Sequence, residues 1–311
     1  MSLNVRELNN EEVGRSQSYL RTYIDTLDTY IDPSDYDPVM RALDTFFKNE
    51  GFTEVCAQNR FSILSACEDV FNISSMEYCG KKWPNPQSSQ LWLEWDLLTR
   101  PDLHGVFCRT TSYREEKKIV QGRHFVCFPL FEFESRGNFS DLLELLTRLV
   151  KFLGYSDPVH LDYTTVANQY GTKELEHEHE ARMCEENGPV CFLKDFPEFT
   201  HPFWNMARDG TGIAKKVDVI LSGHESIGCA ERSCDIEQMR EIFYTICDGE
   251  YHKAIFEKFG QDRTEKELEA FLKLQMCNRF GAGLGVTRLI NSLKKEGLME
   301  QLKYRFGTTK Q

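Results

Sequence analysis

Residues 106–134 read VFCRTTSYREEKKIVQGRHFVCFPLFEFE, and this stretch decides the fold class. Its two ends, 106–113 and 124–134, are rich in the aromatic and β-branched residues that favour strands. Between them, 114–123 holds four basic residues and a glycine. Two strand patterns on either side of a charged, glycine-containing connection predict an antiparallel pair joined by a loop.

Helical spacing of apolar residues surrounds this pair on both sides. Helices are predicted over 5–31, 38–48, 142–153, 174–186 and, with breaks near Gly249 and Gly260, 236–274. Further strands are predicted over 51–55, 190–193, 203–206 and 217–221. Since no internal repeat or flexible linker is visible, one compact α+β domain over 36–311 is expected, after an N-terminal helical extension over 1–35.

The composition is that of a globular protein. Of 311 residues, 41% are hydrophobic and 28% charged, which excludes disordered and collagen-like classes. No apolar run is long enough to cross a bilayer or to form a signal peptide, so a cytoplasmic location is expected. The net charge of -12 argues against a nucleic-acid-binding surface. The 11 cysteines lack any C-x-x-C spacing, which predicts reduced thiols.

Glycines alternate in the segment 281–288, GAGLGVTR, directly before a predicted helix that runs to Leu293. Such a segment permits close backbone approach, and the first amides of the helix could hold a phosphate. A glycine turn that packs a helix against a sheet would leave the same pattern. The spacing differs from the dinucleotide-binding fingerprint and lacks the lysine of a P-loop. Arg288 adds a planar cation suited to phosphate or to a purine.

Two charged segments are interpreted as solvated surface. Lys215 and Lys216 adjoin a predicted strand, and a pair of adjacent charges usually faces water. The segment 177–180, HEHE, lies on a predicted helix, where the two histidines at positions i and i+2 point apart and do not form a metal site.

Several motifs resemble the class II aminoacyl-tRNA synthetases. Arg114-x-Glu116, followed by Arg123-His124 and Phe128, resembles motif 2 of that class, and 281–288 resembles motif 3. Segments over about 36–294 resemble the aspartyl/asparaginyl group in particular: QSSQLWLE at 87–94, VFC at 106–108, SYR at 112–114, DFP at 195–197, FW at 203–204, and VDV at 217–219 followed by Glu225 and Arg232. The resemblance implies an antiparallel β-sheet core flanked by helices, and a homodimer.

ATP and Mg²⁺ are the cofactors that this resemblance implies. Arg114 would hold the α-phosphate and the acyl oxygen, Glu116 would contact the adenine amino group, and His124 would meet the γ-phosphate or pyrophosphate. Phe128 and Arg288 would cover the two sides of the adenine. Guanidinium donors and Mg²⁺ suit adenylation because charge develops on the α-phosphate and on the leaving pyrophosphate.

Other matching positions would hold the metal and the amino acid. Glu225 and Asp218 would bind Mg²⁺, and Arg232 would grip the substrate carboxylate or amide as a further catalytic residue beside Arg114 and Arg288. Leu93 stands where the aspartyl type has a lysine. Glu94 follows it, as in the asparaginyl type, and a carboxylate at this position suits an amide or an ammonium. The residues expected to contact the amino acid are Glu68, Gln90, Glu94 and Arg232.

Two local features complete this expectation. Glu132 and Glu134 lie with Phe128 on the predicted return strand of motif 2. Pro129 interrupts that strand, which predicts an edge or a bulge there.

Only about 35 residues precede the first core helix, so no anticodon-binding domain is expected. A core of this size resembles ammonia-dependent asparagine synthetase, which adenylates the β-carboxylate of aspartate and lets ammonia displace AMP. The implied partners are aspartate or a related amino acid and ammonia, with no tRNA and no membrane. Two alternatives stay open: a synthetase paralogue that transfers aspartate or asparagine to a tRNA, a carrier or a small amine, and a regulatory module. Arg114, Glu116, Glu225 and Arg288 argue against the module because they form a full phosphate-handling set.

Overall fold

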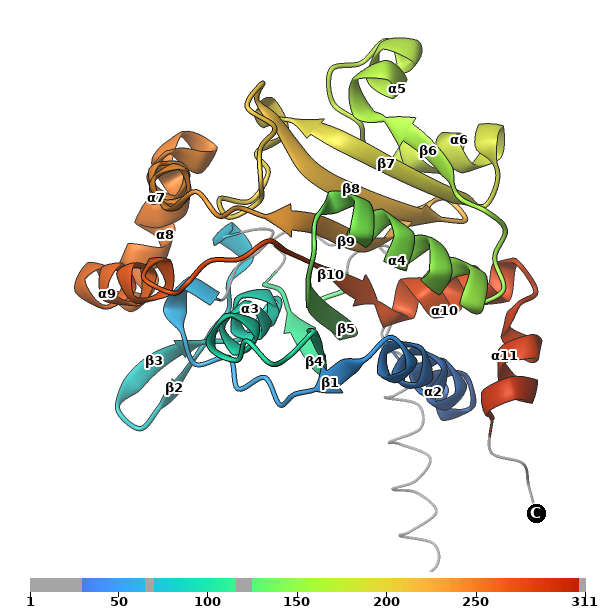
Figure 1. Cartoon of the computed structure of the whole chain (residues 1–311), viewed down its shortest axis with the longest axis horizontal. Helices are drawn as coiled ribbons and strands as arrows, with labels where there is room; N and C mark the ends of the chain where they lie inside the picture. Colours follow the sequence, from blue (N-terminus) through green and yellow to red (C-terminus); the bar gives the residue numbers. More distant parts are fainter. Residues whose placement is uncertain (1–29, 65–69, 116–124, 308–311) are drawn as a thin grey trace, which may run out of the picture.

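The computed structural model describes residues 30–64, 70–115 and 125–307 (Figure 1). The helix predicted over 5–31 lies outside these ranges except for its last two residues, which are not helical. None of the helices in the described ranges is both long and apolar enough to cross a membrane.

A mixed sheet of eight strands forms the centre, in the order β1-β4-β5-β10-β9-β8-β7-β6. All pairings from β4 to β7 are antiparallel, and the two outermost pairings, β1 with β4 and β6 with β7, are parallel. The strands are β1 (Phe52–Glu54), β4 (Gly105–Tyr113), β5 (Cys127–Arg136), β6 (Val159–Asp162), β7 (Val190–Pro197), β8 (Ile213–Leu221), β9 (His224–Arg232) and β10 (Arg279–Gly285). The predicted α+β class with an antiparallel sheet core is confirmed.

Helices surround this sheet in three groups (Figure 1). The first group packs on the largest apolar cluster and contains α2 (Pro33–Asn49), α4 (Phe139–Phe152), α10 (Val286–Lys295) and α11 (Met299–Phe306). The second forms its own core with α3 (Gln90–Thr99), α7 (Ile236–Thr245), α8 (Glu250–Phe259) and α9 (Gln261–Leu272). The third packs beside β7 and contains α5 (Tyr163–Tyr170) and α6 (His177–Asn187). A separate hairpin is formed by β2 (Ser75–Tyr78) and β3 (Lys81–Pro84).

Local sequence signals explain where the helices behind the sheet begin. Pro33 is the first residue of α2, and the Asp32 side chain accepts the Ser34 N–H at 2.7 Å. At the start of α4, Asn138 and Asp141 accept each other's backbone N–H groups in a capping box. These caps fix the starts of two helices that pack on the largest apolar cluster.

Two sequence predictions need correction. The segment 203–206 forms a turn with one bridge from Met206 to Arg232, not a strand, because Trp204 is buried among helix side chains of the second group. The glycines of 281–285 lie within β10, not in a turn, and α10 starts after them.

Pro129 behaves as its chemistry predicts. It pairs with Thr111 of β4, while the pairing of β5 with β10 begins only at Leu130. One side of β5 is therefore an edge at the proline, where no ladder N–H is needed.

Candidate active site

Small residues in the centre of the sheet create a cavity of about 430 Å³. Two rows of directly paired residues run side by side across β5, β10, β9 and β8. Directly paired residues of neighbouring strands project on the same face, so each row is flanked by long side chains and hollow in its middle. The rows are Glu132, Gly283, Gly228 and Asp218, and Glu134, Gly281, Ala230 and Lys216.

At the β5 side of this cavity, Glu132 is held by the segment that leads into α3. Its carboxylate accepts the Ser88 hydroxyl and, at 2.8 Å, the Ser89 N–H. Burial raises the pKa of Glu132 to about 7, although both donors act in the opposite direction. Ser88, Gln90, Glu132 and Arg232 all line the cavity and present donors and acceptors suited to an amino acid.

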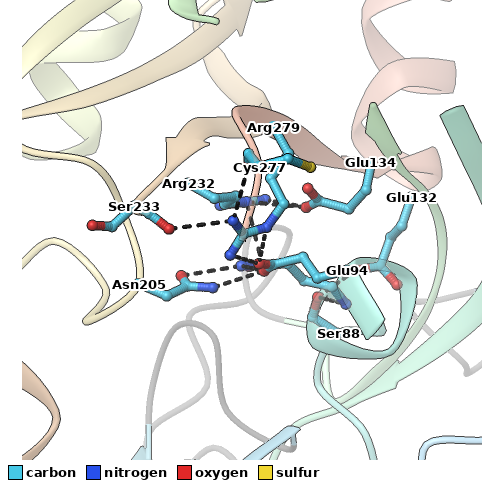
Figure 2. A network of polar contacts seen from close by, with 10 residues as sticks. Ser88, Glu94, Glu132, Glu134, Asn205, Arg232, Ser233, Cys277 and Arg279 are labelled. Atoms are coloured by element: carbon cyan, nitrogen blue, oxygen red, sulfur yellow. Dashed lines mark hydrogen bonds and ion pairs between the residues drawn. The ribbon is translucent and has the colours of Figure 1, made fainter. Parts of the chain in front are cut away.

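Beside and behind this wall lies a buried network of polar and charged side chains (Figure 2). Arg279 Nε lies 2.8 Å from Glu94 Oε2, while Gln90 Nε2 and Asn205 Nδ2 donate to Glu94 Oε1 at 2.9 and 2.7 Å. Arg232 donates from Nε and Nη2 to Glu134 Oε1 at 3.0 and 2.6 Å, and its Nε lies 3.8 Å from Glu94. The network thus pairs two guanidiniums with two carboxyl groups, as burial of such groups requires.

Glu94 does not occupy the place that the sequence suggested. Its side chain is 0% exposed and four donor atoms surround its two oxygens, so it does not line the cavity. The prediction of direct substrate contact needs correction: Glu94 orients Gln90 and lies beside Arg232, which do line the cavity.

Glu134 needs the glycine that faces it. A Cβ at Gly281 would lie 2.0 Å from Glu134 Oε1. Burial raises the pKa of Glu134 to about 8, and the Arg232 charge opposes this rise. Its Oε2 atom has no hydrogen-bond partner within the described ranges, so one buried acceptor next to Arg232 is left for a further donor.

The opposite side of the cavity is acidic. A Cβ at Gly228 would lie 3.2 Å from Glu225 Oε1 and 3.9 Å from Asp218 Oδ1, so the two predicted metal ligands converge over this glycine. Glu180 from α6 also lines the cavity, and its Oε2 accepts the Glu225 N–H at 2.8 Å. Burial, reinforced by the Glu225 charge, raises the pKa of Asp218 to about 7 against the effect of Lys216.

This acidic side fits Mg²⁺ bound together with phosphates. Asp218 Oδ1 is buried without a hydrogen-bond partner in the described part of the chain, and Glu225 lies beside it. No cluster of three or more His, Cys, Asp or Glu residues within the described ranges could hold an ion by itself. Mg²⁺ commonly takes one or two carboxylates and completes its shell with phosphate oxygens and water, so the donor set of Asp218 and Glu225 is compatible with such an ion.

Three predicted nucleotide residues lie on strand ends and on the first turn of a helix. The Arg114 guanidinium is 5.2 Å from the centre of the Phe128 ring, across the end of the β4–β5 pair. Arg288 Nη1 donates to the Glu225 carbonyl oxygen at 2.7 Å, which connects α10 to the acidic side. The other predicted ligands, Glu68, Glu116 and His124, lie outside the described residues.

Sequence reasoning missed several residues of this site. Arg279 could have been found by treating 279–285 as a strand, since its period of two puts Arg279 on one face with Gly281. Glu180 and Lys216 belong to segments that were interpreted as solvated surface, and only the packing of α6 and β8 brings them to the cavity. Asn205 carried no local signal.

Comparison with known proteins agrees with this architecture. The chain belongs to the family tRNA synthetases class II (D, K and N), which matches residues 36–301. Within that family its fold is that of an aspartyl/asparaginyl synthetase catalytic core, and the family consists of ATP-dependent ligases. No curated protein matches the sequence.

Solved structures share the fold at low sequence identity. Entamoeba histolytica asparaginyl-tRNA synthetase with asparaginyl-adenylate has a TM-score of 0.69 and 18% identity, covering 96% of this chain and 71% of that one. The Pyrococcus horikoshii enzyme with the same adenylate has a TM-score of 0.68 and 18% identity, covering 98% and 73%. Entamoeba histolytica aspartyl-tRNA synthetase has a TM-score of 0.62 and 15% identity, covering 99% and 62%.

Proposed function

We propose that this chain activates aspartate with ATP as an acyl-adenylate and transfers it to ammonia, which yields asparagine, AMP and pyrophosphate. The observation that carries this proposal is the charge balance on the β5 side of the cavity. Arg232 and Glu132 line that side together, so one cation and one carboxyl group face the cavity there, while Arg279 pairs with Glu94 behind them. Such a surface complements a group that carries both charges, such as the α-ammonium and α-carboxylate of an amino acid.

Aspartate bound in this way directs its β-carboxylate toward the acidic side, where the phosphates of ATP would lie. An oxygen of the β-carboxylate attacks the α-phosphorus, and the bond from that phosphorus to pyrophosphate breaks. Arg114 would donate to the α-phosphate as charge builds up there. Asp218 and Glu225 would hold Mg²⁺, which supplies neutralisation of the phosphate charge.

The second step consumes the adenylate. The nitrogen of ammonia attacks the β-carbonyl carbon, the bond to the AMP oxygen breaks, and the nitrogen releases its extra proton to water. One cavity would hold both reactants, and such positioning supplies a large part of the rate enhancement in bimolecular reactions.

The same charge balance also supports a second candidate, activation of asparagine with transfer to a tRNA, a carrier or a small amine. A neutral amide would meet Arg232 through its oxygen and an acidic oxygen through its NH₂ group, without adding charge to the network. Glu134 Oε2, the buried acceptor beside Arg232, is such an oxygen.

Product analysis separates the two candidates. AMP and pyrophosphate release are measured with ATP, Mg²⁺ and either aspartate or asparagine, with and without ammonium, and products are identified by mass spectrometry. Asparagine formed from aspartate only when ammonium is present supports the proposal. Activation of asparagine that ignores ammonium, or turnover that needs an added tRNA, contradicts it. An Arg114→Ala variant serves as the inactive control, because it lacks the proposed donor to the α-phosphate. The variant should still fold, since Arg114 lies at a strand end, outside the core.

A further inference from the structure

Two adjacent lysines of β8 have different surroundings. Lys215 Nζ lies 3.0 Å from Glu231 Oε1, and its side chain is 37% exposed. Lys216 projects into the cavity, where its Nζ lies 2.7 Å from Asp218 Oδ2 and 3.9 Å from the centre of the Phe196 ring. The interpretation of this pair as solvated surface is therefore wrong for Lys216.

Lys216 is also the one lysine that lines the cavity within the described ranges. Three carboxylates gather on the same side: Asp218, Glu225 and Glu180. Their three negative charges, less the one positive charge of Lys216, leave two, and one divalent cation compensates that remainder. Without Lys216 the acidic side would repel a polyanion such as ATP even after one metal ion had bound.

We propose that Lys216 is a resident cation of the phosphate side: it pairs with Asp218 in the absence of a divalent ion, and it binds ATP phosphate oxygens once the ion takes that carboxylate. This inference rests on the proposed use of ATP. A lysine is suited to the exchange because its ammonium carries three donors on a flexible stem. The face of Phe196 would keep the ammonium close to both partners, through cation–π attraction.

The inference predicts opposite changes for two ligands when the charge is removed. In Lys216→Met, Mn²⁺ should bind more tightly without nucleotide, because nothing competes for Asp218. ATP in the presence of saturating Mg²⁺ should bind about tenfold more weakly, which is the loss of one charge-assisted hydrogen bond. Isothermal titration measures ATP binding, and electron paramagnetic resonance of free Mn²⁺ measures metal binding.

Matched variants make the result specific. Lys215→Met removes the neighbouring charge on the same strand and should change neither affinity. Lys216→Arg keeps the charge and should retain ATP binding in the presence of Mg²⁺. If Lys216→Met binds both ligands as the unmodified chain does, or loses affinity for both together, the inference is overturned. If the unmodified chain fails to bind ATP even with Mg²⁺, the proposed function fails and the inference falls with it, a different result from the first two.

Discussion

Replacement of Arg279 by methionine should strongly destabilise the protein. Arg279 is 0% exposed, and its Nε and Nη2 lie 2.8 and 2.7 Å from Glu94 Oε2. Its Nη1 donates to the carbonyl oxygens of Ser233 and Cys277, each at 3.2 Å. Methionine fills much of the same volume, so the change removes the charge and its bonds while it leaves most of the packing.

The loss of stability in Arg279→Met follows from the hydrogen bonds that Glu94 keeps and those that it loses. Glu94 keeps its Gln90 and Asn205 donors on Oε1, but Oε2 loses both arginine nitrogens in a site without water access. Removal of one partner from a buried ion pair costs about 3–5 kcal/mol, whereas an apolar replacement of both partners is often close to neutral. We therefore expect the double variant Glu94→Met/Arg279→Met to be more stable than Arg279→Met alone.

Urea unfolding followed by tryptophan fluorescence measures the free energies of the single and double variants. The measured coupling should be favourable and larger than about 1 kcal/mol. An Arg279→Met variant within about 1 kcal/mol of the unmodified protein, far less than the expected cost, would refute the reasoning. Strictly additive effects of the two substitutions would refute it as well.

Three further predictions concern the candidate active site and the strands that form it. Arg114→Lys should lower kcat about 10²–10³-fold in the pyrophosphate-release assay, since an ammonium lacks the two-pronged donor geometry of a guanidinium. Gly281→Ala should destabilise the fold, because its Cβ would lie 2.0 Å from Glu134 Oε1, while Gly283→Ala meets nothing closer than 3.6 Å and should be tolerated in the same urea assay. Burial raises the pKa of Glu132 from 4.5 to about 7, so with rising pH this carboxyl group loses its proton in the unfolded chain before it does in the folded one. The free energy of unfolding should therefore fall between these two pH values, by at most about 1.4 kcal/mol per pH unit. Glu132→Gln should flatten this pH dependence in the same urea assay.

Local patterns in the sequence were sufficient for most of the scaffold. The strands on both sides of 114–123 and the helix predicted over 142–153 follow from side-chain periodicity, which is a property of short segments. Period two also places Glu132 and Glu134 on one face of β5, where the structure has both of them. The motif resemblance identified the family, which the match over residues 36–301 confirms.

The site itself depends on pairings between distant segments. Lys215 and Lys216 have the same interpretation from sequence alone. The strand period of two puts them on opposite faces of β8, but only the packing of the sheet decides which face holds the cavity. Similarly, the depth of Glu94 depends on Arg279, which is 185 positions away in the chain. Periodicity reports which residues share a face, but burial and charge pairing arise from contacts between elements, so the sequence by itself determined the family and the scaffold, and only the tertiary structure decided which charges face the cavity.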